Sequence, residues 1–278
     1  MVRSQQRRAA VLGSPIAHSL SPVLHRAAYR QLGLDWSYDA VEVDSDALPG
    51  FLESCDASWV GLSLTMPLKE AVLSLLDEAS DLVGLTHSAN TVLFENGRRR
   101  GENTDVEGIR WALATAGAGL EDGLDSMGVS VIGAGATARS AIAALAGMGA
   151  ELIAVVARRA AAIDDLAAVA AGCGVRVAPI PWDRVTDALT ADVVVSTVPI
   201  GASDYLAQRV PTQTATMLDV VYAPWPTPLA GAWQRGGGTA VGGLAMLVGQ
   251  AAVQVELMTG LAAPIEVMHA AGLAALGS

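Results

Sequence analysis

The chain has 278 residues, of which 52% are hydrophobic and 16% are charged. This length predicts one or two globular domains with a sizeable core, and the composition excludes disorder for most of the chain. The 17 basic and 28 acidic residues give a net charge of −11, which repels phosphate backbones and anionic lipid and argues against nucleic acid and membrane surfaces as partners.

Short β-branched runs alternate with Ala/Leu-rich helical runs along the whole chain. Candidate strands are Ala9–Leu12, Ser37–Val43, Val60–Leu64, Val129–Gly133, Leu152–Ala157, Val175–Pro179, Val193–Thr197 and Met217–Val221. Candidate helices are Pro22–Leu32, Pro67–Leu76, Val106–Ala116, Thr137–Met148, Ala160–Ala171, Leu244–Thr259 and Pro264–Leu276. This alternation predicts an α/β fold with largely parallel sheets.

Two early loops carry polar residues beside predicted helix starts. Ser21 precedes Pro22 and fits the N-cap of a helix, while Ser19 stands two residues earlier. Two hydroxyl groups near the positive end of a helix also suit a small carboxylate. Thr65 and Lys69 are four residues apart, about one helical turn, so both side chains can lean to the same side. Lys69 is then either a solvated surface lysine or a proton donor in a water-poor cleft.

A hairpin is predicted where Thr91–Phe94 and Arg98–Gly101 flank the turn residues Asn96-Gly97. With this turn, paired positions sum to 193, so Asn90 faces Asn103. The open end of the ribbon then gathers four polar residues: Ser88, Asn90, Asn103 and Asp105. On their own these residues are explained by Asx turns that close the hairpin.

A glycine pattern follows the strand that starts at Val129. Gly133, Gly135 and Ala138 fit the Gly-x-Gly-x-x-Ala turn of a dinucleotide-binding unit, with a strand before it and a helix after it. The first glycine allows a tight turn, and the second lets the backbone approach a pyrophosphate. The following helix N-terminus offers N–H groups to phosphate oxygens. We therefore predict a nucleotide-binding unit from about Val129 onward.

The residues after the next strand indicate which dinucleotide binds. An NAD site carries an acidic residue ~20 residues after the glycine motif, and here Arg158 and Arg159 take that place. Two guanidinium groups suit the 2′-phosphate of NADP. The alternative is a pair of solvated arginines that follow a strand.

Together these strings resemble the shikimate dehydrogenase family, whose members reduce 3-dehydroshikimate to shikimate with NADPH. The matching strings run in the family's order over nearly the whole chain: Gly13-Ser14-Pro15-Ile16-Ala17-His18-Ser19-Leu20-Ser21-Pro22, Leu64-Thr65-Met66-Pro67-Leu68-Lys69, Ala89-Asn90-Thr91, Asn103-Thr104-Asp105, Gly133-Ala134-Gly135, Asp219-Val220-Val221-Tyr222, Pro226-Thr227-Pro228-Leu229 and Gly243-Leu244-Ala245-Met246-Leu247-Val248-Gly249-Gln250-Ala251-Ala252.

The resemblance implies a role for the residues at matching positions. Ser19 and Ser21 would hold the substrate carboxylate. Lys69 would be the acid–base residue, with Asp105 beside it. The substrate ring and its hydroxyl groups would contact Thr65, Asn90, Asp105, Tyr222 and Gln250. NADP would contact Asp81, Gly133, Ala134, Gly135, Ala136, Thr137, Arg158, Arg159, Val220 and Gly243.

The resemblance also implies two α/β domains separated by a cleft. Residues 1–105 would begin a substrate-binding domain, residues 106–240 would form a Rossmann-like NADP-binding domain, and helices in residues 241–278 would return to the first domain. The partners of the protein would be its small-molecule substrate and coenzyme, and it would need no metal. It would be a monomer or a homodimer. Cys55 and Cys173 have no CxxC motif and no long apolar span is present, so we expect a cytoplasmic protein.

Two alternatives and two departures from the family remain. A catabolic NAD-dependent quinate/shikimate dehydrogenase is disfavoured by the paired arginines and by Ser21, and a non-catalytic NADP-binding protein by intact Lys69 and Asp105. Ala136-Thr137 stands where the family commonly has Gly-Ala, and Ala157 where it often has Asn. These departures concern the detail of the coenzyme contacts.

Overall fold

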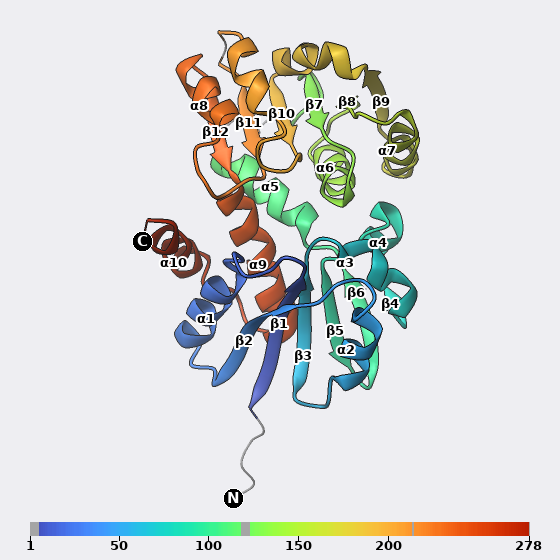
Figure 1. Ribbon diagram of the computed structural model, residues 1–278, viewed down its shortest axis with the longest axis vertical. Coiled ribbons are helices and arrows are strands. Elements are labelled where there is room, and N and C mark those ends of the chain that lie inside the picture. The colour runs from blue at the N-terminus through green and yellow to red at the C-terminus, as the bar shows by residue number, and fades with distance from the viewer. Residues whose placement is uncertain (1–5, 118–122, 213, 278) are drawn as a thin grey trace, which may run out of the picture. The chain divides into compact units, whose positions relative to one another are not determined.

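The computed structural model describes residues 6–117, 123–212 and 214–277, and these divide into two units. Unit 1 comprises Met1–Thr104 and Val248–Ser278, and unit 2 comprises Asp105–Leu247. Each unit holds one six-stranded sheet flanked by helices (Figure 1). The α/β class predicted from the sequence is therefore confirmed.

The sheet of unit 1 is mixed, with the strand order β2-β1-β3-β5-β6-β4. Its strands are β1 (Arg7–Gly13), β2 (Trp36–Glu42), β3 (Trp59–Leu64), β4 (Glu78–Ala79), β5 (Thr91–Glu95) and β6 (Arg98–Glu102). β1 pairs in parallel with β2 and β3, whereas β5 is antiparallel to both β3 and β6. The last residues of β1, β3 and β6 and the first residue of β5 therefore lie along one edge of the sheet, which we call the loop edge.

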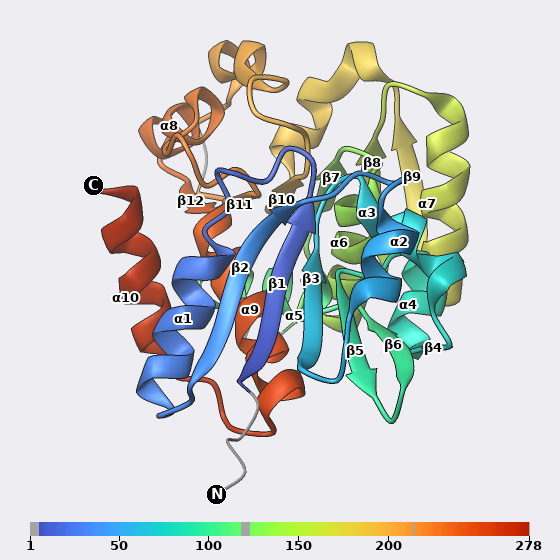
Figure 2. The ribbon, with the colours of Figure 1, turned by 60° about the horizontal axis from the view of Figure 1, so that its bottom comes forward.

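Helices cover both faces of this sheet (Figure 2). The helices are α1 (Ser21–Gln31), α2 (Leu48–Ser54), α3 (Leu68–Ala71), the 3₁₀ helix η1 (Val72–Leu75), α4 (Asp81–Thr86), α9 (Gly243–Thr259) and α10 (Ile265–Leu276). Alternation along β3 explains the two faces. Leu62 and Leu64 join the core on the α2 side, whereas Ser63 between them hydrogen-bonds to Gln254 of α9.

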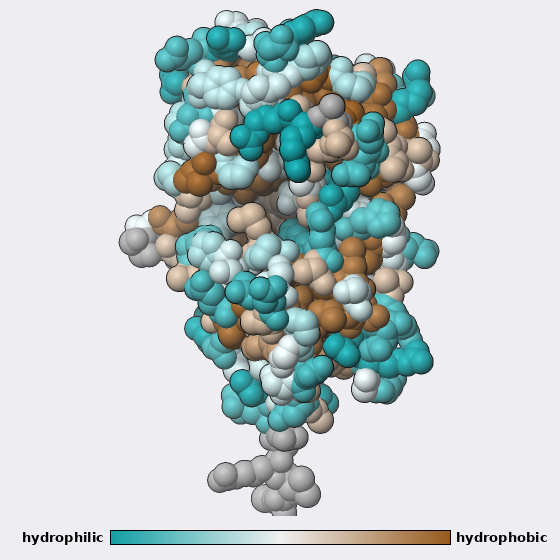
Figure 3. Space-filling model, turned by 45° about the vertical axis from the view of Figure 1, so that its right-hand side comes forward, coloured by the Kyte–Doolittle hydropathy of each residue, from teal (hydrophilic) through white to brown (hydrophobic). Residues whose placement is uncertain are grey.

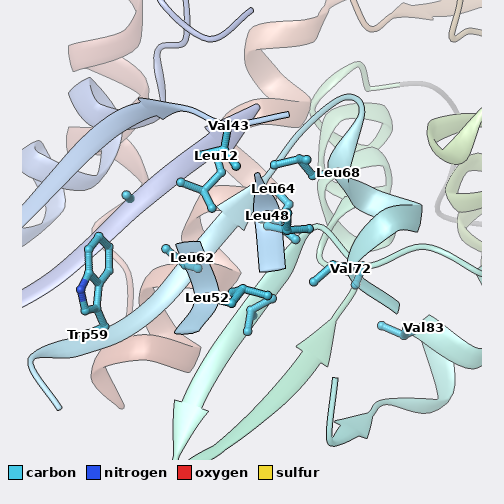
Figure 4. Packing of buried hydrophobic residues seen from close by; sticks show 13 residues of the cluster. Leu12, Val43, Leu48, Leu52, Trp59, Leu62, Leu64, Leu68, Val72 and Val83 are labelled. Carbon is cyan, nitrogen blue, oxygen red and sulfur yellow. The ribbon is translucent and has the colours of Figure 1, made fainter. Parts of the chain in front are cut away.

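The core of unit 1 lies between the sheet and α2. Figure 4 shows Leu12, Leu62 and Leu64 of the strands beside Leu48 and Leu52 of α2. Each of these leucines is at most 4% exposed, and burying one stabilises the fold by roughly 1.5–3 kcal/mol. This packing fixes the strands whose ends carry the loop edge.

The sheet of unit 2 has the strand order β12-β11-β10-β7-β8-β9, and every pairing is parallel. Its strands are β7 (Val129–Ile132), β8 (Leu152–Val156), β9 (Arg176–Ile180), β10 (Val193–Ser196), β11 (Thr216–Asp219) and β12 (Thr239–Gly242). The helices are α5 (Asp105–Thr115), α6 (Ala136–Gly147), α7 (Ala160–Gly172), η3 (Trp182–Thr190), η4 (Asp204–Arg209) and α8 (Pro228–Arg235). This is the doubly wound order, in which ligands bind beyond the carboxyl ends of the strands where the order reverses, here between β7 and β10.

Two sequence predictions about local structure have different outcomes. The hairpin register is confirmed, since Thr91 pairs with Glu102 and Val92 with Gly101. The helical stretch predicted over residues 67–76 is confirmed in its extent, but it is not one regular helix, because the short α-helix α3 tightens into the 3₁₀ helix η1 after Ala71. The backbone then leaves the helix at Leu76, which has an extended conformation.

Hydrophilic residues cover much of the surface in view in Figure 3, with apolar residues in smaller groups between them. Both cysteines are free and partly buried. Among the described residues, no helix combines the length and apolar character that a membrane crossing requires.

Candidate active site

The loop after β1 places Ser19 and Ser21 at the loop edge of unit 1. The predicted N-cap role of Ser21 is wrong: α1 begins at Ser21, because Leu20 already has helical dihedral angles and occupies the N-cap position, where it makes no side-chain hydrogen bond. Instead, the Ser21 N–H donates to Ser19 Oγ over 3.3 Å. No described residue hydrogen-bonds to Ser21 Oγ, so this hydroxyl lies in the first turn of α1 with its hydrogen-bonding capacity unused.

His25 connects the start of α1 to the sheet. Its Nδ1 lies 2.9 Å from the Ser21 carbonyl oxygen, and because a carbonyl only accepts, Nδ1 carries the proton. The ring stacks on Tyr38 of β2 with 3.9 Å between ring centroids. Complete burial lowers the pKa of His25 to about 4, although the hydrogen bond to Ser21 opposes this shift. The imidazole is therefore neutral at neutral pH.

The loop after β3 runs directly beside the loop after β1. The Thr65 N–H donates to the Leu12 carbonyl over 2.9 Å. Gly13 makes this approach possible, since a Cβ there would lie 2.4 Å from Thr65 Cγ2. Lys69 follows in α3 with a partly buried side chain, and its carbonyl accepts from the Ala89 N–H over 2.9 Å. Thr65, Lys69 and the segment before β5 are thus neighbours at the loop edge.

Asn90, Thr104 and Gln250 form a buried cluster at the same edge. Asn90 Oδ1 accepts from the Thr104 backbone N–H over 2.8 Å, which fixes the orientation of the amide because a backbone N–H only donates. Asn90 Nδ2 then donates to Thr104 Oγ1 over 2.9 Å and to Gln250 Oε1 over 3.3 Å. The contact to Gln250 is the longer and therefore the weaker of the two.

Thr104 contacts Asn90 through both its backbone N–H and its hydroxyl group. Asn103 Nδ2 donates to Thr86 Oγ1 over 2.8 Å, and the expected facing of Asn90 and Asn103 stays a prediction. The strand ladder ends at Glu102, and side chains beyond it no longer follow the pairing rule. Thr104 was not among the site residues predicted from the sequence, although it lies within Asn103-Thr104-Asp105, one of the strings that carry the resemblance.

In unit 2, the turn between β7 and α6 has the geometry of a phosphate cradle. Gly133 has φ +121°, and a Cβ there would lie 2.2 Å from Thr197 Oγ1. Gly135 is the N-cap of α6, where a Cβ would meet nothing within 4 Å and no side chain caps the helix. Ala134, Ala136 and Thr137 are partly buried around this turn. The open N–H groups and the space above Gly135 fit a pyrophosphate.

Arg158 and Arg159 follow β8, the strand next to β7. Both side chains are exposed. Within the described ranges neither guanidinium group is engaged in an ion pair or hydrogen bond. Two such groups beside the carboxyl ends of β7 and β8 fit the 2′-phosphate of an NADP molecule that lies across the carboxyl ends of the strands where their order reverses.

Val220 and Tyr222 lie in the loop after β11. Asp219 anchors this loop, since its Oδ2 accepts from Thr227 Oγ1 over 2.8 Å. Burial raises the pKa of Asp219, partly offset by that hydrogen bond. Gly243 lies so close to the loop that a Cβ there would be 2.0 Å from the Val220 carbonyl oxygen.

Asp81 and Asp105 each begin a helix. Asp81 is exposed at the start of α4 in unit 1, and Asp105 is 3% exposed at the start of α5 in unit 2. An acidic side chain in the first turn interacts favourably with the helix dipole. The coenzyme contact expected for Asp81 stays a prediction.

The structure thus gathers the candidate residues in two places. Those at the loop edge of unit 1 are Ser19, Ser21, Thr65, Lys69, Asn90 and Gln250. Those around the strand ends of unit 2 are Gly133, Ala134, Gly135, Ala136, Thr137, Arg158, Arg159, Val220, Tyr222 and Gly243. A doubly wound sheet with this glycine turn defines a dinucleotide-binding protein, here joined to a second α/β unit with its own polar edge.

Comparison with known proteins defines the family. Residues 11–92 match the model described as shikimate dehydrogenase substrate binding domain, and residues 243–271 match the shikimate 5'-dehydrogenase C-terminal domain. A relative from Methanopyrus kandleri, named shikimate dehydrogenase (NADP(+)), is 36% identical in an alignment 277 positions long, which covers 95% of this chain and 93% of the relative. The chain belongs to the shikimate dehydrogenase family.

Solved structures agree with this assignment. The shikimate dehydrogenase of Mycobacterium tuberculosis is 40% identical, with a TM-score of 0.87 over 96% of this chain and 99% of that one. The Thermus thermophilus enzyme, solved in complex with NADP(H) and shikimate, is 34% identical, with a TM-score of 0.85 over 98% of this chain and 100% of that one.

Proposed function

We propose that the protein catalyses the reversible NADPH-dependent reduction of 3-dehydroshikimate to shikimate, a step of chorismate and aromatic amino-acid biosynthesis. The observation that carries the proposal is the loop edge of unit 1, where Ser21, Lys69 and Asn90 gather in a chain of this family. The identity of the substrate and of the coenzyme in this proposal is taken from the relatives named shikimate dehydrogenase (NADP(+)).

Ser19 and Ser21 bind the substrate carboxylate in this proposal. The net charge of −11 repels an anionic substrate, so local donors must hold it. The Ser21 hydroxyl has no partner among described residues and lies at the positive end of α1. A hydrogen bond to a charged group contributes roughly 1.5–3 kcal/mol. The ring hydroxyls then meet Thr65, Asn90, Asp105, Tyr222 and Gln250.

Lys69 is the proposed acid–base residue. NADPH, when bound, supplies the hydride that reduces the substrate ketone. Lys69 Nζ donates a proton to the oxygen of that ketone as it becomes a hydroxyl group, with Asp105 assisting the lysine. In the reverse direction Lys69 accepts the same proton. Holding the substrate and the coenzyme close together in the correct orientation supplies much of the rate acceleration.

Apart from Asp81, the proposed coenzyme residues lie in unit 2. Backbone N–H groups from Gly133 to Thr137 bind the pyrophosphate, and the uncapped start of α6 supports this role. Arg158 and Arg159 bind the 2′-phosphate. Val220 and Gly243 lie beside the nicotinamide, and Asp81 of unit 1 also contacts the coenzyme. Unit 1 is accordingly the substrate-binding domain and unit 2 the NADP-binding domain.

The cell compartment and assembly follow from the same proposal. The two free, partly buried thiols suit the reducing cytoplasm. We propose a cytoplasmic monomer or homodimer whose partners are its substrate and coenzyme. Size-exclusion chromatography with light scattering distinguishes the monomer from the dimer.

The test of this function is the rate of NADPH formation at 340 nm with shikimate and NADP⁺. Parallel reactions with quinate and with NAD⁺ separate the alternatives. The proposal predicts the highest kcat/KM for shikimate with NADP⁺. Higher activity with quinate and NAD⁺ supports a quinate/shikimate dehydrogenase, and no turnover of any pair supports a non-catalytic NADP-binding protein.

A further inference from the structure

A chain of buried hydrogen bonds runs behind the loop edge of unit 1, from Tyr38 on β2 to Asn90. We propose that Gln254 of α9 is a positioning residue: through Thr91 it holds the Asn90 side chain in the orientation that binds a substrate hydroxyl. This inference rests on the proposed function, since it concerns the affinity of the same site for shikimate.

The direction of each hydrogen bond in this chain is determined. Gln254 Nε2 lies 3.4 Å from the Asn90 carbonyl oxygen, which only accepts, so Nε2 and Oε1 are correctly distinguished. Gln254 Oε1 accepts from Ser63 Oγ over 2.7 Å. Because Ser63 has a single hydroxyl proton, the Tyr38 hydroxyl must donate to Ser63 over 2.5 Å.

The other end of Gln254 fixes Thr91. Gln254 Nε2 donates to Thr91 Oγ1 over 2.8 Å, so the Thr91 hydroxyl proton is directed to Asn90 Oδ1, 2.9 Å away. Asn90 Oδ1 also accepts from the Thr104 N–H. A 180° rotation of the Asn90 amide would therefore place its NH₂ group against two hydrogen-bond donors, the Thr91 hydroxyl and the Thr104 N–H. Its Nδ2 is thereby held on the side of Gln250.

Burial makes this chain rigid. Thr91 and Gln254 have no exposed surface, and Asn90 is 2% exposed. Water is thus not at hand to replace a lost partner, and an unpaired buried group costs free energy. Gln254 and Gln250 are one helical turn apart on α9, so both glutamines face the same side of the helix. One face of α9 then supplies both the residue proposed to contact substrate and the residue that aligns its neighbour.

Pre-alignment of Asn90 predicts a specific kinetic effect. Without the donor from Gln254, the Thr91 hydroxyl is free to rotate, and the Asn90 side chain keeps only its hydrogen bonds to Thr104 and Gln250. Asn90 is then held less firmly, and part of its ordering is left until the substrate binds. We expect Gln254→Met and Thr91→Val each to raise the KM for shikimate roughly three- to tenfold. We expect kcat and the KM for NADP⁺ to stay within about twofold. The double variant should be no worse than Gln254→Met, because both changes break the same chain.

The matched controls are a rescue and a hydroxyl outside the chain. Thr91→Ser keeps the hydroxyl group and should restore the KM for shikimate to within about twofold of wild type. Tyr29→Phe removes another buried hydroxyl that faces α9, but this one contacts Met258 Sδ at 3.8 Å. Tyr29→Phe should therefore leave the KM for shikimate unchanged.

Kinetics with shikimate and NADP⁺, together with the melting temperature of each variant, decide the question. A lower melting temperature with an unchanged KM for shikimate in Thr91→Val overturns the inference, and so does a KM raised equally by Tyr29→Phe. If Gln254→Met does not fold, the comparison of Thr91→Val with Thr91→Ser still decides. A wild-type protein without shikimate turnover overturns both the proposed function and this inference, whereas an active wild type with unaffected variants overturns the inference alone.

Discussion

Alanine substitution at the two glycines of the β7–α6 turn separates coenzyme binding from folding. At Gly133 the backbone has φ +121°, and a Cβ would lie 2.2 Å from Thr197 Oγ1. A side chain in such a conformation costs roughly 1–3 kcal/mol, and overpacking adds about 1–3 kcal/mol. Gly133→Ala should therefore lower the stability of unit 2 by roughly 2–6 kcal/mol, seen as a lower melting temperature.

Gly135→Ala should behave in the opposite way. Its φ of −87° and ψ of −171° are open to any residue, and a Cβ meets nothing within 4 Å. The stability change should stay below about 1 kcal/mol, the typical value of an N-cap substitution. The added methyl group instead occupies space needed by the pyrophosphate. Losing one charge-assisted hydrogen bond costs roughly 1.5–3 kcal/mol, so the KM for NADP⁺ should rise about ten- to a hundredfold.

The assay measures initial rates against NADP⁺ at saturating shikimate, with calorimetric titration of NADP⁺ and a thermal melt for each variant. The KM for shikimate is the internal control and should not change. If Gly135→Ala binds NADP⁺ as tightly as wild type, the pyrophosphate does not lie over this turn. If Gly133→Ala is as stable as wild type, the steric argument is wrong.

Further predictions address the substrate side, the 2′-phosphate and pH. Lys69→Met should lower kcat by ~10²–10⁴-fold with little change in the KM for shikimate; a change in KM alone would make Lys69 a binding residue. Ser21→Ala should raise the KM for shikimate about ten- to a hundredfold without lowering the melting temperature. Ser19→Ala should raise this KM and also lower the melting temperature slightly, because it removes the hydrogen bond from the Ser21 N–H. Unchanged KM values in both variants would contradict carboxylate binding by these serines. Arg158→Ala should raise the KM for NADP⁺ about ten- to a hundredfold and leave the KM for NAD⁺ unchanged; equal use of both coenzymes by the wild type contradicts this. Burial lowers the pKa of His25 from 6.5 to about 4, so the unfolded chain binds a proton at His25 before the folded protein does. The contribution of neutral His25 to the free energy of unfolding is therefore complete above pH 6.5 and is lost as the pH falls toward 4, by roughly 3 kcal/mol in total. In urea unfolding at pH 7 and pH 4.5, His25→Gln should lose less stability at the lower pH than wild type, and an equal loss would refute the buried, neutral state of His25.

Local patterns in the sequence were sufficient for much of the fold. The Asn96-Gly97 turn set the register of the β5–β6 hairpin, because a two-residue turn leaves no freedom in which residues pair. β12 escaped prediction because Thr239–Gly242 is four residues long and contains only one large apolar side chain. α8 was also missed, although Thr227 caps it and a proline follows in the first turn, which is a recognisable start signal.

The candidate site was less predictable where contacts join distant parts of the chain. Ser21 was assigned a cap from its position before Pro22, but the backbone becomes helical one residue earlier. The link from Ser63 to Gln254 spans 191 positions. Alternation along β3 places Ser63 on one face of the sheet, but no local pattern selects its partner on α9. Such pairings depend on how helices pack on the sheet.

The most direct test of the central claim follows the hydride itself. The protein is incubated with 3-dehydroshikimate and NADPH that carries deuterium at both C4 positions of the nicotinamide, and the product is examined by mass spectrometry and NMR. We expect shikimate with one deuterium on the carbon that bears the new hydroxyl group, formed at a strongly reduced rate by Lys69→Met. Unlabelled shikimate, or no shikimate at all, would contradict the proposed function.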